Sequence, residues 1–337
     1  MRPSLRGTLI KLVVAVSPLT AAGCLVFDGE RQPDAGVDSR LPTSDCGGWR
    51  TFRVLVEEPP PIELAALVDA CETDPATCIQ LCNEVLRRSV IDSNTNVTAT
   101  QCDVTHSPTG HDVAIGYYGS CGAEGRRPAG LARGRKPRAG IAGTHLARSA
   151  WYEAASVYAF VSLARELARF GAPKTLRDAA KRAAIDEVHH ARLMGDLARA
   201  RGATPPKVEI EDPGLRSLES IAIENVTEGI VGETWAALIA FWQAAHATDP
   251  TMRATYARIA EDELRHAELS IEVDAWARTK LRPAARKRVD AARTRALAKL
   301  AKGVKTTQPA ALVAELGMPD AAAMQKLFAN ARARVWA

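Results

Sequence analysis

A short motif that occurs twice is the part of the chain best suited to carry chemistry. Residues 186–190 read DEVHH and residues 262–266 read DELRH, so each copy contains Asp-Glu-x-x-His. On an α-helix, side chains three positions apart lie on one face, so the Glu and His of each copy can reach the same point. Two such helices facing each other would bring carboxylates and imidazoles together, a donor set that suits iron or manganese.

The hydrophobic pattern predicts that these side chains are buried. Glu187 and His190, like Glu263 and His266, fall on alternating steps of four and three residues that otherwise carry mostly apolar side chains. That stripe faces the core of a helical bundle. A buried carboxylate without a partner costs on the order of several kcal/mol, and bound cations would remove this cost. A solvated face is the alternative for a single Glu-x-x-His, but two copies in the same setting favour metal binding.

An Asp precedes the Glu in both copies. Asp186 and Asp262 each lie four residues before the His of their own motif. From there a carboxylate can accept a hydrogen bond from the ring nitrogen that faces away from a metal ion, which fixes the imidazole. We expect each Asp to orient the His of its own motif.

Two further helices are predicted to supply one Glu each. The pattern predicts helices over residues 144–170, 173–201 and 213–247 and a fourth from residue 250. Glu153 is the acidic residue in the apolar stripe of the first helix. On the third helix, the spacing to the turn prolines favours Glu228, and Glu233, which has its own apolar stripe, is the alternative. The predicted ligands are therefore Glu153, Glu187, His190, Glu228 or Glu233, Glu263 and His266.

The connection between the second and third helices is long. Residues 202–213 read GATPPKVEIEDP and are typical of an extended segment. About eleven extended residues span roughly 36 Å, and the second helix is roughly 45 Å long. The connector can therefore return along most of a bundle, as in the topology with one long crossover.

Residues 141–281 resemble a ferritin-like di-iron carboxylate domain because they combine the paired motifs with two further glutamates. The Asp before each Glu resembles the oxygen-activating branch, which includes ribonucleotide reductase small subunits and bacterial multicomponent monooxygenases. The run from GRRPAGL to EDELRHAEL also resembles exported ferritin-like proteins of bacteria such as the myxobacteria. The resemblance implies two iron ions, with manganese possible, and O2 or peroxide together with an electron donor. No Cys follows residue 121, so the rubredoxin-type site of rubrerythrins is absent.

The N-terminus predicts export. Residues 1–24 begin with basic residues, continue with a short apolar run and end in LTAAGC. This arrangement is typical of a signal peptide and resembles a lipobox, in which Cys24 would be acylated. An ordinary signal peptide with an incidental Cys is the alternative. Residues 25–45 are polar and predict a flexible tether. We expect a lipoprotein of the outer membrane or the periplasmic side.

Six more cysteines lie between residues 46 and 121, at Cys46, Cys71, Cys78, Cys82, Cys102 and Cys121. An even number behind an export signal predicts three disulfides, although six cysteines allow 15 pairings. Strand-like and helix-like runs alternate here, so residues 46–121 predict a small disulfide-stapled α+β domain.

The remaining segments complete the expected organisation. Residues 122–140 are rich in Gly, Pro and Arg and predict a basic linker, and residues 282–337 predict a C-terminal helical extension. The net charge of +5 does not require a nucleic-acid partner, and a monomer or dimer is expected rather than a cage. The predicted function is an O2- or peroxide-using oxidoreductase. A non-catalytic iron-binding protein and a metal-free scaffold are the alternatives.

Overall fold

The computed structural model describes residues 4–17, 48–57, 60, 62–89, 97–107, 110–119, 126–132, 137, 139–211 and 213–337. These residues are mainly helical and include one small sheet, which confirms the predicted class at that level. The chain divides into two compact units. One holds the sheet and the two helices next to it in sequence, and the other holds the N-terminal helix and the long helices from residue 141 onward.

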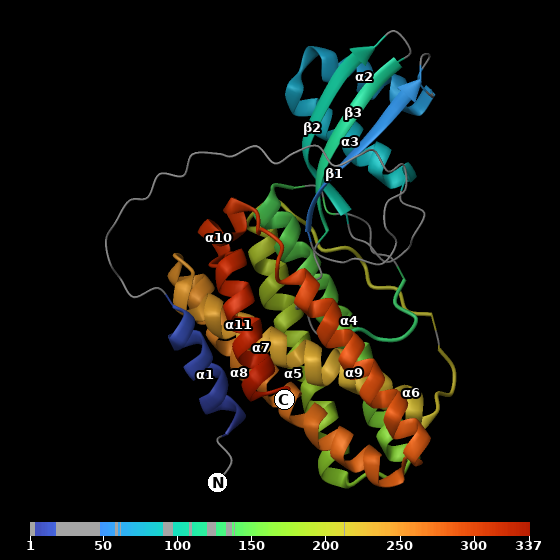
Figure 1. The fold of residues 1–337 in the computed structure, drawn as a ribbon, viewed down its shortest axis with the longest axis vertical. Coiled ribbons are helices and arrows are strands. Elements are labelled where there is room, and N and C mark those ends of the chain that lie inside the picture. Colours follow the sequence, from blue (N-terminus) through green and yellow to red (C-terminus); the bar gives the residue numbers. More distant parts are fainter. Residues whose placement is uncertain are drawn as a thin grey trace. The chain divides into compact units, whose positions relative to one another are not determined.

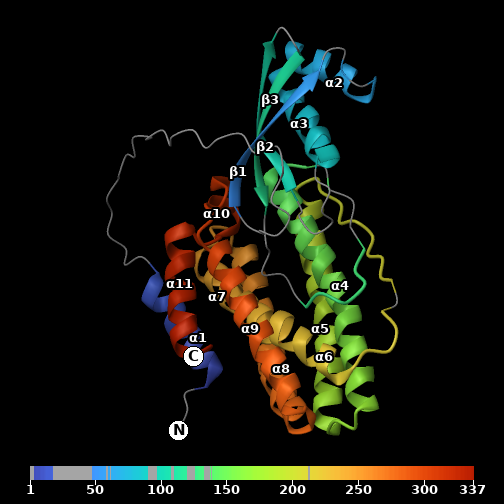
Figure 2. The same cartoon turned by 45° about the vertical axis from the view of Figure 1, so that its right-hand side comes forward.

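The sheet unit has three antiparallel strands in the order β1-β3-β2. Its elements are β1 (Gly48–Glu57), α2 (Ile62–Thr73), α3 (Pro75–Ser89), β2 (Val97–Ser107) and β3 (Gly110–Gly119). Alternate residues of β3, Val113 and Ile115, are fully buried and form the core together with apolar side chains of α2 and α3. Figures 1 and 2 show this unit as the blue-green part of the chain.

Two disulfides hold this unit together. Cys71 pairs with Cys78, and Cys82 pairs with Cys102. Cys46 and Cys121 lie outside the described residues, so the third disulfide stays a prediction. Disulfides persist in oxidising compartments, and these two therefore indicate a non-cytoplasmic protein.

Long helical stretches form the core of the other unit (Figure 1). They are α4 (Ile141–Arg169), α5 (Lys174–Arg199), a third stretch made of α6 (Leu218–Glu224), η1 (Asn225–Glu233) and α7 (Thr234–His246), and α8 (Pro250–Lys280). α4 packs along α5, α7 and η1 pack along α8, and α5 packs against α8. Gly171, at φ +70°, ends α4, and Asp249 caps the N-terminus of α8 by accepting a hydrogen bond from the Thr251 amide.

The connection from α5 to α6 runs extended over residues 203–211, as predicted. It pairs with residues 126–132, where the Glu211 amide donates to the Gly130 carbonyl (2.8 Å) and the Ala132 amide donates to the Glu209 carbonyl (2.9 Å). Within the predicted basic linker of residues 122–140, this stretch therefore pairs with another segment and is not solvated on all sides. Arg126 is fully buried, because its guanidinium finds acceptors on Glu224 and Asn225.

The third helical stretch departs from the continuous α-helix predicted for residues 213–247. Its middle section, η1, is a π-helix, whose i→i+5 hydrogen bonds place more residues in each turn than an α-helix does. Gly229 lets η1 approach α8 closely, because a Cβ there would lie 2.4 Å from Ser270 Oγ. The Asn225 amide group donates to the Ser270 carbonyl at 2.8 Å and ties the start of η1 to α8.

The predicted extension forms α9 (Pro283–Gly303), α10 (Ala310–Leu316) and α11 (Ala321–Arg334). Within the predicted export signal, residues 5–16 form α1 (Leu5–Val16), which packs against α7, α8 and α11. Cys24 and the tether lie outside the described residues. Among the residues described, no helix is both long and apolar enough to cross a membrane.

Candidate metal centre

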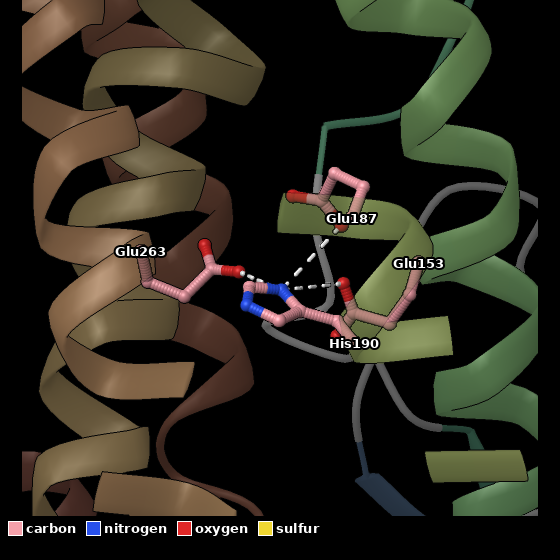
Figure 3. Close-up of side chains that lie close together, drawn as sticks. All are labelled: Glu153, Glu187, His190 and Glu263. Carbon is pink, nitrogen blue, oxygen red and sulfur yellow. Dashed lines mark ion pairs between the residues drawn. The ribbon is translucent and has the colours of Figure 1, made fainter. Parts of the chain in front are cut away.

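Acidic and imidazole side chains from α4, α5, η1 and α8 meet inside the helical unit. Glu153, Glu187, His190 and Glu263 each place one donor atom within 4.8 Å of the others, as do Glu233, Glu263 and His266. Glu263 belongs to both groups, so they form one continuous cluster. Figure 3 shows the first group, with His190 between Glu263 of α8 and the glutamates of α4 and α5.

Both imidazoles turn their Nδ1 atoms into the cluster. His190 Nδ1 lies 3.7 Å from carboxylate oxygens of Glu153 and Glu187 and 3.4 Å from Glu263 Oε1 (Figure 3). His266 Nδ1 lies 3.2 Å from Glu187 Oε1 and 3.8 Å from Glu263 Oε2. Glu187 and Glu263 therefore face both imidazoles.

The donor atoms have no hydrogen-bond partner inside the protein. Both carboxylate oxygens of Glu187, Glu233 and Glu263 are buried without one, and so are the Nδ1 atoms of His190 and His266. Buried polar atoms are nearly always paired, so a cluster of unpaired ones requires an explanation. The four glutamates carry a formal charge of −4, and two divalent cations carry +4. The residues present thus fit metal ions in donor type and in charge.

Without metal, burial favours the protonated form of two of the glutamates. Burial raises the pKa of Glu153 well above its usual range, and repulsion from Glu187 raises it further. Burial and repulsion from Glu263 likewise raise the pKa of Glu233. Burial also opposes ionisation of Glu187 and Glu263, but the neighbouring imidazoles outweigh it and lower the pKa of each carboxyl group.

The metal-free site favours protonated imidazoles. Burial opposes a positive charge on His190, yet its hydrogen bond to Asp262 and the nearby cluster glutamates raise its pKa well above the usual value. Burial also opposes a positive charge on His266, but Asp186 and the cluster glutamates raise the pKa of this ring. Because metal ligands must be deprotonated, protons and metal ions compete for this site.

The aspartates pair with the imidazoles in a crossed pattern, and the within-motif pairing predicted from the sequence is wrong. His190 Nε2 donates to Asp262 at 3.0 Å, and His266 Nε2 lies 3.4 Å from Asp186. Both contacts join α5 to α8. The crossing follows from the packing of these two helices, which brings each ring's outer nitrogen closer to the Asp of the facing helix.

Arg265 is a residue that the sequence analysis missed. Its guanidinium lies 3.3 Å from Asp186 and also pairs with Asp262, so one half-exposed cation holds both aspartates. Burial alone would raise the pKa of both carboxyl groups. The neighbouring imidazoles and the Arg265 guanidinium together outweigh burial, so the pKa of each carboxyl group is lowered. Its place inside the second motif, between Glu263 and His266, was the available signal.

On the third helical stretch, the structure places Glu233 in the cluster and leaves Glu228 out of it. Glu233 is fully buried, whereas Glu228 is half-buried and joins neither donor group. The preference for Glu228 was wrong because it assumed regular α-helical turns. Each turn of η1 holds more residues than an α-helical turn, so the residues that follow face other directions than a regular helix would give them.

The ring of Phe160 lies beside the centre. It is fully buried, and its centroid lies 4.9 Å from that of the His266 ring. The Arg126 guanidinium lies over the Phe160 ring, with its Cζ 5.9 Å from the ring centroid.

Comparison with family models, curated proteins and solved structures finds no match to this chain. The structure thus characterises a mainly helical, disulfide-containing protein whose buried carboxylate and histidine cluster could hold metal ions.

Proposed function

We propose that the helical unit is a ferritin-like di-metal carboxylate domain and that the protein is an O2- or peroxide-using oxidoreductase of the cell envelope. The observation that supports this most strongly is the buried cluster of four glutamates and two histidines whose donor atoms lack partners. The single extended crossover between α5 and α6 is consistent with the ferritin-like topology.

In this proposal one ion binds Glu153, Glu187, His190 and Glu263, and the other binds Glu233, Glu263 and His266, with Glu187 within reach of both. Iron is the preferred metal and manganese the second choice, because the donors are carboxylates and imidazoles with no thiolate. Bound iron would supply redox chemistry toward O2 or peroxide.

The residues around the donors have separate tasks. Asp262 and Asp186 hold the protons on the outer nitrogens of His190 and His266, so that each ring presents its Nδ1 to the ion. Arg265 keeps both aspartates ionised and in place. Phe160 covers the His266 ring and keeps water from that side of the site.

The π-helix supports turnover over storage. π-helical segments are rare and occur frequently at functional sites. Here η1 ends at a donor residue, Glu233. A site that only sequesters iron does not require a rare π-helical segment in a helix that carries a metal ligand.

We further propose that residues 1–24 direct export and that Cys24 carries the lipid anchor. The two disulfides support a compartment outside the cytoplasm. Intact-mass measurement of the protein from a bacterial envelope fraction tests this, since processing would leave a chain that begins at acylated Cys24.

The test of function is oxidant consumption by the reduced, iron-loaded protein. We expect O2 or peroxide to be consumed repeatedly while a chemical reductant is supplied, with a change in the iron absorption bands. Consumption that stops after one equivalent per site, with iron accumulating in a large oligomer, would contradict the enzyme and support sequestration.

A further inference from the structure

The penultimate residue of the chain contacts the π-helix. Trp336 is 5% exposed, and its indole Nε1 donates to the Ile230 carbonyl at 3.3 Å. Ile230 lies within η1, three residues before Glu233. A side chain from the C-terminal extension therefore bonds to the backbone of the segment that carries a proposed metal ligand.

The chain fixes this indole firmly in place. The Trp336 amide donates to the Ala331 carbonyl at 3.1 Å, and its own carbonyl accepts from Arg293 Nη2 of α9 at 3.0 Å. Its ring lies 6.0 Å from that of Phe328 on α11, measured between centroids. Both α9 and α11 thus contribute to holding the donor that reaches η1.

The start of η1 is held from a different direction. The Asn225 side chain donates to the Ser270 carbonyl of α8 and accepts from the buried Arg126 guanidinium at 3.1 Å. Because π-helical turns are rare, contacts from outside the segment are needed to favour this geometry over a regular α-helix. Of the side-chain hydrogen bonds described here, the one from Trp336 to Ile230 lies nearest to Glu233 along the chain.

We infer that Trp336 is a positioning residue that stabilises η1 in its π-helical geometry and thereby places Glu233 in the metal cluster. This inference rests on the proposed di-metal site. An α-helical register would favour Glu228 at the seam, so the C-terminal extension sets which glutamate is presented. The indole N–H is the group that does this, since the hydrogen bond to Ile230 needs a donor that a phenyl ring lacks.

The first test is Trp336→Phe in the full chain, with Trp276→Phe as the matched control. Trp276 lies on α8 beside Lys280, so its replacement changes an aromatic side chain without removing the bond to Ile230. Anaerobic titration with Fe²⁺ alone measures both ions. We expect Trp336→Phe to weaken the ion held by Glu233 and His266 about two- to tenfold, the size of one neutral hydrogen bond, and to leave the other ion unchanged.

A second readout does not depend on metal. In chelator, amide hydrogen exchange across residues 225–234 should be faster in Trp336→Phe than in the wild type or in Trp276→Phe, because η1 loses a contact. Unchanged exchange in η1 would overturn the inference. Faster exchange in Trp336→Phe, together with a wild type that binds no metal, would instead support the role of the contact and reject the di-metal site.

A double variant distinguishes positioning from general packing. If Trp336 acts through Glu233, then adding Trp336→Phe to Glu233→Gln should produce no further loss in affinity for the second ion, because coupled residues are non-additive. Additive losses, or equal weakening of both ions, would show that Trp336 merely supports the fold and would overturn the inference.

Discussion

Replacing Glu233 by Gln tests which glutamate of the third helical stretch is the metal ligand. The π-helix η1 presents Glu233, whereas a regular α-helix would favour Glu228. The change removes one negative charge from the cluster while keeping the shape of the side chain. Removing one partner of a buried charge pair costs about 3–5 kcal/mol, and 1.4 kcal/mol corresponds to a factor of ten. Affinity for the ion held with Glu263 and His266 should therefore fall roughly 150- to 4,000-fold.

The metal-free protein should respond in the opposite direction. Glu233 is buried beside Glu263, and burial together with that repulsion raises its pKa. A neutral amide at this position matches the neutral form that the metal-free site favours and removes the cost of ionising a buried carboxyl group, so the Tm in chelator should stay the same or rise. Glu228→Gln is the matched control, because the side chain is half-buried and such changes usually alter stability by less than about 0.5 kcal/mol.

Calorimetric titration with Fe²⁺ under anaerobic conditions measures the affinities, and thermal unfolding with and without chelator measures both stabilities. The expected pattern is a lost ion in Glu233→Gln and two intact ions in Glu228→Gln. The reverse pattern would show that Glu228 is the ligand and would refute the role assigned to η1.

Three further predictions concern protons, orientation and disulfides. In chelator, the free energy of unfolding should fall as the pH rises above about 6.5, because both site histidines have raised pKa values and the folded state keeps protons that the unfolded chain releases. In the iron-loaded protein the free energy of unfolding should rise over the same pH range. Parallel pH curves for the two forms would contradict this prediction. Asp262→Asn should weaken the ion bound by His190 about 10- to 100-fold and spare the other, whereas a loss confined to the other ion would support within-motif pairing. The two described disulfides use four of the six cysteines between residues 46 and 121, so non-reducing peptide mapping should find Cys46 linked to Cys121, and two free thiols would reject the third disulfide.

Much of the centre could be predicted because its residues obey local rules. Glu187 and His190, and likewise Glu263 and His266, lie on one face of regular helices, so their spacing alone indicated a shared site. Glu153 was identifiable as an acidic residue inside an apolar stripe. The structure brings all five together with one further glutamate.

The features that were missed depend on contacts between distant segments. η1 follows from the close approach that Gly229 allows and from bonds made by Arg126, Asn225 and Trp336. No periodicity within residues 213–247 contains that information. The crossed pairing of Asp186 and Asp262 likewise depends on how α5 and α8 are offset along each other.

The burial of Arg126 illustrates the same limit. A run rich in Gly, Pro and Arg has the composition of a solvated linker, yet two acceptors on the third helical stretch, Glu224 and Asn225, make burial of this guanidinium favourable. Composition describes the average behaviour of such a segment and does not reveal a specific partner 98 residues away.

Metal content of the full chain, purified without chelator and loaded anaerobically with iron, tests the central claim most directly. The wild type should hold about two ions per chain, as the donor set implies, and a Glu187→Ala/Glu263→Ala variant should hold none while remaining folded in chelator. A wild type that binds no stoichiometric metal, or a variant that retains both ions, would contradict the di-metal centre and leave the cluster as part of a metal-free scaffold.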